Sequence, residues 1–228
     1  MTSSSPRVSC IMPTFNRRPF VPLAIADFLA QDHPDRELVV LDDGTDAVAD
    51  LMPADPRVRY VRLDRKLPIG TKRNVACEEA RGDIILHWDD DDWAARWRVR
   101  YQTAALLEHG ADVCGLDAVL FYDPTGPRAW EYVYPAGGRP WVYGATLCYT
   151  KAFWRRNPFR GVAVGEDTRF VWAHSTGGRI VALPERAFYV GMIHAANTSP
   201  KRTGDRRWRS VDVSTVTALL EERAGQWP

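Results

Sequence analysis

An apolar segment that runs into four consecutive aspartates, residues 84–92, constrains the fold of this chain more than any other stretch. Residues 84–88 are rich in β-branched and aromatic side chains, which is typical of a buried strand in a parallel sheet. Four adjacent carboxylates at a strand end repel one another, so we expect a cation beside Asp89 to Asp92. Mg²⁺ and Mn²⁺ take oxygen ligands and usually bind through one or two carboxylates plus substrate phosphates. The alternative is an exposed acidic turn that caps a helix beginning near Ala94, and the spacing alone supports both interpretations equally.

Strands and helices alternate at short intervals through the first half of the chain. Apolar runs bounded by turn residues predict the strands, and apolar positions three and four residues apart predict the helices. Such alternation is typical of an α/β fold with a mainly parallel sheet, in which the alternating segment 58–63 forms an edge strand. The predicted strands cover residues 8–12, 38–41, 58–63 and 84–88, and the predicted helices cover residues 20–30, 69–80 and 97–109.

The second half of the chain has a different pattern. Segments 113–122 and 130–134 predict two strands of a hairpin, joined by the turn at residues 123–126. Further along we expect a helix at 167–173, a strand at 180–183, an apolar stretch at 188–193 and a terminal amphipathic helix at 213–223. We therefore expect a single domain over residues 1–228, with a change of character near residue 115.

Composition narrows the classes of partner. The formal net charge of the 228 residues is only +1, so nothing demands a nucleic acid. Four widely spaced cysteines without a CxxC pair favour buried thiols in a reducing compartment over disulfides or zinc. No apolar run approaches the ~20 residues that span a bilayer, and the polar N-terminus does not resemble a signal peptide. We expect a cytoplasmic protein without a transmembrane segment, and leave open peripheral binding at the inner membrane face and homo-oligomerisation. Nine tryptophans suggest a surface for flat ligands such as sugars or bases, although tryptophan is also core material.

Five motifs, in order, resemble the GT-A glycosyltransferases, specifically the nucleotide-sugar-dependent inverting enzymes of family 2. The first two are the strand and turn at residues 8–17 and the strand and turn at residues 38–45. The others are the basic segment 72–74, the acidic run in the place of the family's Asp-x-Asp motif, and the acidic segment 166–170. The resemblance covers roughly residues 8–200, and five ordered motifs are far more specific than one. This chain departs from the family in having four aspartates in the run and in carrying Arg96 where a proline is common.

The resemblance implies a GT-A fold, with a Rossmann-like, mainly parallel sheet flanked by helices and a smaller mixed lobe on the acceptor side. Residues 7–115 would bind the nucleotide sugar, and residues 116–228, with a basic C-terminal loop and a terminal helix, would bind the acceptor. The implied reaction moves a sugar from a nucleotide diphosphate donor, a UDP-sugar, to a hydroxyl acceptor with inversion and with Mn²⁺ or Mg²⁺. The acceptor stays open among glycans, lipid-linked sugars, natural products and proteins.

The family motifs also imply roles for individual residues. Asp91 and His194 would bind the metal, and Asp167 would be the general base that removes the acceptor proton. A lone histidine is more often a surface or core residue, and a carboxylate near a helix start is often a cap. Nucleotide-sugar binding would fall to Pro13, Thr14, Phe15, Asp43, Arg73, Asp89 and Asp90.

The register within the acidic run is open. If the motif is Asp-x-Asp-Asp, Asp89 faces the ribose and Asp91 binds the metal, whereas a shift by one residue gives these positions to Asp90 and Asp92. The segment around Asp43 has a simpler interpretation too, because Asp and Gly are the residues that ordinary turns use.

Two other functions compete. A nucleotidyltransferase or pyrophosphorylase also uses a parallel sheet and carboxylate-bound Mg²⁺, but it usually carries a glycine-rich basic loop where this chain has residues 13–16. A non-catalytic carbohydrate-binding module would use the tryptophans but would not need both Asp91 and Asp167. The basic segment 197–209 is either a solvated loop or a mobile loop that closes over the donor diphosphate.

Overall fold

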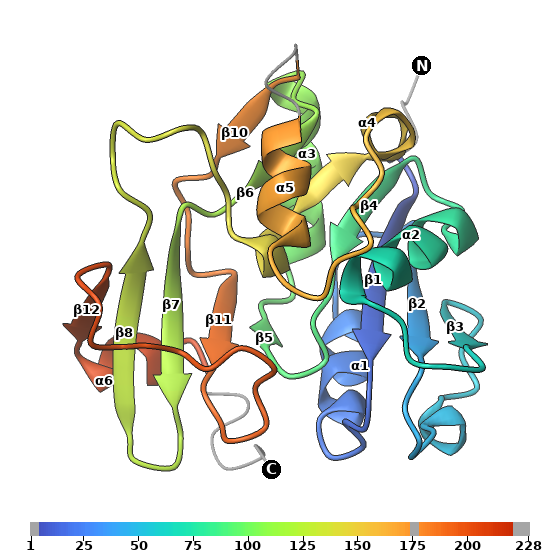
Figure 1. The fold of residues 1–228 in the computed structure, drawn as a ribbon, viewed down its shortest axis with the longest axis horizontal. Coiled ribbons are helices and arrows are strands. Elements are labelled where there is room, and N and C mark those ends of the chain that lie inside the picture. Colours follow the sequence, from blue (N-terminus) through green and yellow to red (C-terminus); the bar gives the residue numbers. More distant parts are fainter. Residues whose placement is uncertain (1–4, 174–177, 221–228) are drawn as a thin grey trace.

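Two β-sheets, which lie side by side in Figure 1, organise the residues that the computed structural model describes, 5–173 and 178–220. The first sheet has the strand order β10-β6-β9-β4-β1-β2-β3, and the second has the order β12-β8-β7-β11-β5. The first contains β1 (Val8–Thr14), β2 (Arg36–Asp42), β3 (Val58–Arg62), β4 (Ile84–His87), β6 (Val113–Gly115), β9 (Cys148–Thr150) and β10 (Ile180–Ala182). The second contains β5 (Trp93–Ala94), β7 (Ala118–Asp123), β8 (Arg128–Val133), β11 (Tyr189–Met192) and β12 (Trp208–Val211). The helices are α1 (Val21–Leu29), α2 (Ile69–Glu79), α3 (Arg98–Glu108), α4 (Lys151–Arg156), α5 (Glu166–Ala173) and α6 (Val213–Thr217), with 3₁₀ turns η1 (Ala49–Leu51) and η2 (Gly144–Thr146).

The first sheet is buried on both faces. Strands β4, β1, β2 and β3 pair in parallel, and β3 lies at the edge, as the sequence predicts. Neighbouring side chains of β1 point to opposite faces: Cys10 packs in the core with α1 and α3, and Ile11 packs in the core with α2 and α5. This two-sided burial explains the continuous apolar run at residues 38–41. The predicted α/β class is confirmed, and α1, α2 and α3 match their predicted limits to within one residue.

The second sheet confirms the predicted hairpin, because β7 and β8 pair antiparallel. The predicted strand at residues 113–122 is wrong as one element, since β6 belongs to the first sheet and β7 to the second. Between them, the Leu116 amide donates to Thr146 Oγ1 at 2.9 Å, and its carbonyl accepts from the Tyr143 amide at 2.7 Å. These bonds to a distant segment redirect the chain, and no local pattern signals them.

The chain leaves the first sheet after β6 and returns to it twice. Strand β9 lies between β4 and β6 and runs antiparallel to both, and β10 pairs with β6 in parallel. Residue 115 therefore marks a change of sheet, and the division of the chain into a donor half and an acceptor half stays a prediction.

Several smaller expectations can be compared with the structure. The acidic run does not cap a helix near Ala94, because β5 occupies that position and pairs with β11. The basic segment 197–209 is a loop only in its first part, since Trp208 begins β12, where it packs against Phe121 and Tyr132. Of the terminal helix predicted at residues 213–223, α6 forms only Val213–Thr217; residues 218–220 are not helical, and residues 221–223 lie outside the described residues. All four cysteines are buried and free, as predicted. Among the described residues, none of the helices combines the length and the apolar character that crossing a bilayer requires.

Candidate active site

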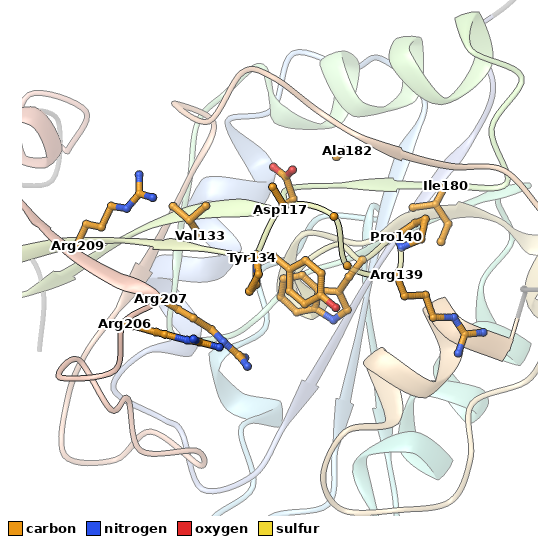
Figure 2. Close-up of a pocket in the computed structure, with 15 residues that line it drawn as sticks. Asp117, Val133, Tyr134, Arg139, Pro140, Ile180, Ala182, Arg206, Arg207 and Arg209 are labelled. Carbon is orange, nitrogen blue, oxygen red and sulfur yellow. The ribbon is translucent and has the colours of Figure 1, made fainter.

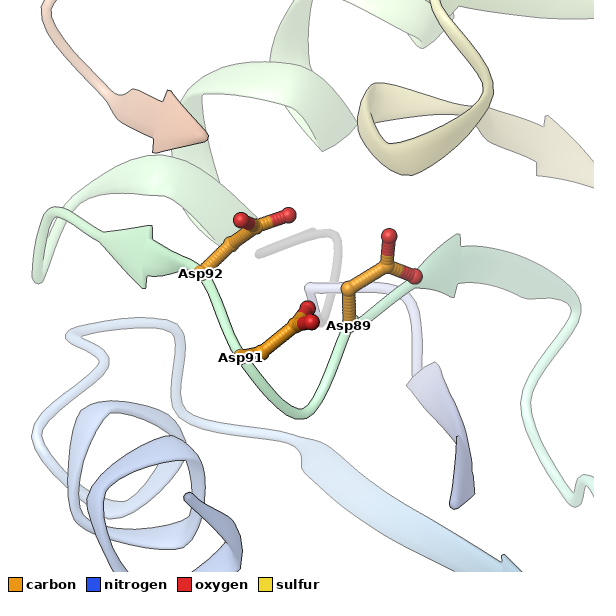
Figure 3. Close-up of side chains that lie close together, drawn as sticks. All are labelled: Asp89, Asp91 and Asp92. Atoms are coloured by element: carbon orange, nitrogen blue, oxygen red, sulfur yellow. The ribbon is translucent and has the colours of Figure 1, made fainter. Parts of the chain in front are cut away.

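The acidic run forms a turn directly after β4, at the edge of the first sheet where parallel strands have their carboxyl ends (Figure 3). Oxygen atoms of Asp89, Asp91 and Asp92 lie within 4.8 Å of one another, and the three side chains are half-buried. Asp90 is outside this group: it is buried and contacts the Thr14 side chain. Burial, followed by the charge of Asp91, raises the pKa of Asp90 to about 8. This arrangement favours the register in which Asp89 and Asp91 form the Asp-x-Asp pair.

Asp91 has the most cationic and donor groups around it. Its Oδ2 atom lies 3.4 Å from Arg17 Nη1, 3.2 Å from His194 Nε2 and 3.4 Å from Asn197 Nδ2. Burial acts to raise the pKa of Asp91, but the bond to His194 and the charge of Arg17 outweigh it and lower the pKa. The ring of Phe20 stacks on His194, with centroids 4.4 Å apart, and fixes the plane of the imidazole. The two residues predicted to bind a metal are thus in contact.

The other two carboxylates contact different elements. Asp92 accepts hydrogen bonds from the Tyr189 hydroxyl and from the Met192 amide, the latter at 2.8 Å, and so ties the turn to β11. Asp89 faces Arg73, with a nitrogen–oxygen distance of 4.0 Å. Burial raises the pKa of both Asp89 and Asp92, and the neighbouring carboxylates add to the shift. The turn therefore concentrates negative charge where a bound cation would relieve it.

Arg73 connects the acidic turn to the helix that carries Asp167. This arginine is buried on α2 and forms an ion pair with Glu166, the first residue of α5, while it also faces Asp89. Asp167 is half-buried, and its Oδ1 accepts a hydrogen bond from the Thr168 amide at 2.6 Å. Within the described residues no cation pairs with Asp167. Glu166 is thus engaged by an arginine, and Asp167 has a carboxylate that can take a proton.

The position of Asp167 depends on a glycine that the sequence did not single out. A Cβ atom at Gly144 would lie 2.1 Å from Asp167 Oδ2, so no larger residue fits there without displacing the carboxylate. The Gly144 carbonyl accepts a hydrogen bond from His87 Nδ1 at 2.7 Å, which ties η2 to the end of β4. Burial lowers the pKa of His87 well below its usual value, so the imidazole is neutral and supports the site from below.

Asp43 lies at the end of the neighbouring strand and is held firmly. It is buried, forms an ion pair with Lys72, and accepts a hydrogen bond from the Leu67 amide at 2.9 Å. Lys72 also donates to the Thr14 carbonyl at 2.5 Å, which joins the ends of β1 and β2. The turn itself is built by Asp42, whose carboxylate accepts from backbone amides two and six residues further on, at 2.8 and 3.0 Å. Asp43 is therefore more than a turn residue.

The loop after β1 contributes an aromatic surface. Pro13 and Phe15 are half-buried, and Lys66 Nζ lies 3.8 Å from the centroid of the Phe15 ring. Together with Asp43 and Thr14, these residues form one group beside α2. The structure thus brings the predicted nucleotide-binding residues of β1 and β2 together. Arg73 instead faces Asp89 and pairs with Glu166, the residue before Asp167.

One lysine of the basic segment reaches the site. Lys201 is half-buried and donates a hydrogen bond to the Tyr143 hydroxyl at 3.1 Å. Burial acts to lower the pKa of Lys201, but Tyr143 and the charges of Asp92 and Asp89 outweigh it and raise the pKa. The sequence predicts a basic loop near the site, and the structure places this one cation beside the acidic turn.

Arg98 is a supporting residue that sequence reasoning missed. It is fully buried on α3, and its Nη2 atom donates to the carbonyls of His87 and Ala145, both at 2.8 Å. It thereby fixes the end of β4 just before the acidic turn. The only local signal is that Arg98 shares a helix face with Gln102, to which its Nε donates at 3.0 Å.

The fold is that of the GT-A glycosyltransferases, with the acidic turn at the carboxyl end of β4. The chain is similar to S. aureus TarS 1-349 in complex with UDP-GlcNAc, with a TM-score of 0.65, 19% identity, and coverage of 96% of this chain and 66% of that one. It is also similar to the mannosyltransferase PcManGT from Pyrobaculum calidifontis in complex with GDP-Man and Mn²⁺, with a TM-score of 0.66, 20% identity, and coverage of 86% and 58%.

The chain belongs to glycosyl transferase family 2, whose family model matches residues 9–183. Among curated relatives, the succinoglycan biosynthesis protein ExoO of Rhizobium meliloti (strain 1021) is 35% identical over 119 residues, which is 50% of this chain and 34% of that protein. The chain spans less than half the length of the curated relatives it matches. The family and the fold predicted from the sequence are confirmed.

Proposed function

We propose that this chain moves a sugar from a UDP-sugar to a hydroxyl acceptor, with inversion at the anomeric carbon and with the help of Mn²⁺ or Mg²⁺. The observation that carries the proposal is the group of Asp89, Asp91 and Asp92 within 4.8 Å, beside the Arg73–Glu166 pair at the start of the helix with Asp167. Membership of the family supports a glycosyltransferase. The complexes of the similar TarS and PcManGT structures with UDP-GlcNAc and GDP-Man support a nucleotide-sugar donor.

The acidic turn fits a hard divalent cation. Three half-buried carboxylates offer the oxygen ligands that Mg²⁺ and Mn²⁺ prefer. We assign metal binding first to Asp91, because its lowered pKa keeps it ionised, and to His194, which contacts it. His194 Nδ1 is buried without a hydrogen-bond partner among the described residues. When bound, the cation would neutralise the negative charge that the leaving diphosphate develops.

Two cations of the chain orient the diphosphate. The charges of Asp92 and Asp89 act on Lys201, and Arg73 lies 4.0 Å from Asp89. The N–H groups of these two cations form charge-assisted hydrogen bonds to phosphate oxygens, which hold the donor in one orientation. Asp89 faces the ribose in this arrangement.

The group beside α2 recognises the base. The Phe15 ring and Pro13 provide a flat apolar contact, and the backbone next to Thr14 borders it. Asp43 is fixed by Lys72 and by the Leu67 amide, yet a carboxylate has about four lone-pair sites and so retains room for a base N–H. Asp90 supports the turn from its buried side. Residues 7–115 thus provide most of the donor site and residues 116–228 the acceptor site, with His194 and Lys201 of the second half reaching the metal and the diphosphate.

Asp167 acts as the general base. Its carboxylate takes the proton of the acceptor hydroxyl while that oxygen attacks the anomeric carbon opposite the diphosphate, which inverts the configuration. Gly144 leaves the space that this carboxylate occupies.

The test is calorimetric titration of UDP with Mn²⁺, with EDTA, and with the Asp91→Ala variant. Because a bridging cation contributes several kcal/mol, we expect EDTA and Asp91→Ala each to weaken UDP binding about a hundredfold, and Mn²⁺ to restore only the wild type. Asp64→Ala, at an exposed position, is the matched control. UDP binding that is unchanged by EDTA and by Asp91→Ala would contradict the assignment of metal binding to this site. Incubation with UDP-sugars and candidate acceptors should release UDP. Release of pyrophosphate from a mixture of UTP and a sugar 1-phosphate would instead indicate a nucleotidyltransferase.

A further inference from the structure

A cavity of about 680 Å³ lies outside the residues assigned to the donor (Figure 2). Its walls come from residues 133–141, which begin with the last residue of β8, from the two ends of β10, and from the basic residues before and within β12. The charged residues that line it are Asp117 and four arginines, Arg139, Arg206, Arg207 and Arg209. The lining is therefore strongly basic, although the chain as a whole has a net charge of only +1.

An aromatic wall joins this cavity to the start of α5. The rings of Tyr134 and Trp141 stack, with centroids 4.7 Å apart and an angle of 22° between their planes. Trp141 Nε1 donates a hydrogen bond to Thr168 Oγ1 at 3.1 Å, and Thr168 directly follows Asp167. Flat aromatic faces bind the apolar faces of sugar rings. A saccharide on this wall would thus lie next to the residue that we propose as the general base.

The arginines of the cavity are held by neutral groups. Arg207 Nη1 donates to the Tyr132 hydroxyl at 3.3 Å, and Arg139 Nη2 donates to the Trp172 carbonyl at 2.6 Å. Within the described residues, neither these two nor Arg206 forms an ion pair with a carboxylate. Figure 2 places Arg206 and Arg207 on one side of the Tyr134 ring and Arg139 on the other, with Asp117 apart from them. Guanidinium groups that form no direct ion pair keep their planar donors available for carboxylates and phosphates.

We propose that this cavity binds the acceptor, and that the acceptor is an acidic saccharide. Its sugar rings stack on Tyr134 and Trp141, its carboxylate or phosphate groups bind Arg206 and Arg207, and a free hydroxyl reaches Asp167. This assignment rests on the proposed transferase function, because only a transferase requires an acceptor hydroxyl at that carboxylate. A neutral glycan would use the aromatic wall and leave the arginines without partners.

The test compares four ligands of the wild-type chain by calorimetry: tetragalacturonate, phosphorylated maltotetraose, unmodified maltotetraose and inorganic polyphosphate. We expect at least one acidic saccharide to bind at least tenfold more tightly than maltotetraose and polyphosphate. Whether tetragalacturonate or phosphorylated maltotetraose binds more tightly identifies the anionic group as a carboxylate or a phosphate. Equal binding of the neutral saccharide would overturn the acidic assignment, and equal binding of polyphosphate would overturn the saccharide assignment.

Variants locate the binding site. The double variant Arg206→Ala/Arg207→Ala should weaken the acidic saccharide at least tenfold, because it removes the charge-assisted hydrogen bonds to the anionic groups. Tyr134→Ala should weaken acidic and neutral saccharides alike. The control Arg81→Ala/Arg155→Ala removes two exposed arginines outside the cavity and should change nothing. Unchanged binding in the first double variant would overturn the proposal. Titration with UDP and Mn²⁺ reports separately on folding and on the proposed function, since the cavity variants should bind UDP as the wild type does.

Discussion

The proposed donor side and the proposed acceptor cavity of this protein differ in how their charged side chains are paired. Beside the acidic turn, buried cations are matched to carboxylates, as in the pairs Lys72–Asp43 and Arg73–Glu166. Around the cavity, the arginines are exposed and have neutral partners or none among the described residues. Removal of one partner from a buried pair typically costs 3–5 kcal/mol, whereas an exposed charge contributes little to stability. The first region therefore has one fixed shape, and the charges of the second remain for a ligand.

The largest expected effect tests whether the reaction takes place at Asp167, between the two regions. Asp167→Asn keeps the shape of the side chain but removes its proton affinity, so kcat should fall roughly 100- to 10,000-fold while UDP affinity stays the same. Steady-state kinetics and calorimetry measure the two quantities, with Asp64→Asn as a control at an exposed site. If the variant keeps its kcat and loses UDP affinity, Asp167 contributes to donor binding and is not the general base.

The second-largest expected effect tests the position of Asp167 through a backbone residue, Gly144, that leaves space for it. Gly144→Ala places a methyl group in the space of Asp167 Oδ2, and displacement of a catalytic group by about 1 Å costs about a hundredfold in rate. Gly126→Ala is the matched control, because its Cβ would meet no atom closer than 3.8 Å. In the background of Asp167→Asn, the Gly144 substitution should cost little more, because both changes act on one group. Additive losses would show that Gly144 acts independently of Asp167.

The smallest effect sharpens the contrast in stability. Glu37 is fully buried and accepts hydrogen bonds from Ser9 Oγ and the Arg81 amide, both at 2.6 Å, and it pairs with Arg59 at 3.3 Å. Glu37→Gln should lower the free energy of unfolding by about 1–3 kcal/mol, whereas Arg206→Ala should change it by less than about 0.5 kcal/mol. Denaturant titration at neutral pH measures both. Equal changes in the free energy of unfolding for the two variants would contradict the proposed difference in stability between the regions.

The same pair of variants predicts a dependence on pH. Burial acts to raise the pKa of Glu37, but its bonds to Ser9, the Arg81 amide and Arg59 outweigh it and lower the pKa. A lowered pKa stabilises the fold above the unfolded value of about 4.3, and that contribution is lost as the pH falls through the folded value. The difference between wild type and Glu37→Gln should therefore shrink in acid. A difference that grows in acid contradicts this sign.

Local sequence patterns were sufficient to predict the strands and helices that carry the proposed donor side. Alternation and turn residues predicted β1, β2, β4 and their helices, because a strand buried on both faces leaves an unmistakable apolar run. The acidic run was found because four adjacent carboxylates are unusual at a strand end, whereas the Glu166–Asp167 helix start was found through the family resemblance. The difference between Glu166 and Asp167 followed only from resemblance, and the Arg73 pair supplies its physical basis.

What the sequence could not supply depends on contacts between distant segments. Arg98 reads as a surface residue of an amphipathic helix, and only its bonds to the end of β4 show it to be a buried support. Gly144 matters because of a side chain on another helix, and the split of residues 113–122 depends on Thr146. The set of aspartates proposed to bind the metal, Asp89, Asp91 and Asp92, could be chosen only when the geometry of the turn placed the fourth aspartate elsewhere.

The hydrogen bonds that hold the acidic turn have a consequence for how this protein folds during its synthesis on the ribosome. Asp92 is separated from Met192 by 100 residues along the chain, and Asp91 from His194 by 103. At a synthesis rate of roughly 5–20 residues per second, the aspartates leave the ribosome about 5–20 s before the groups that neutralise and anchor them. During that interval the strands of the first sheet can pair, but the acidic turn has neither β11 nor His194 beside it. The site of a nascent chain is therefore unfinished until residues 189–194 emerge, and the same segment supplies β11, which joins β5 to β7 in the second sheet.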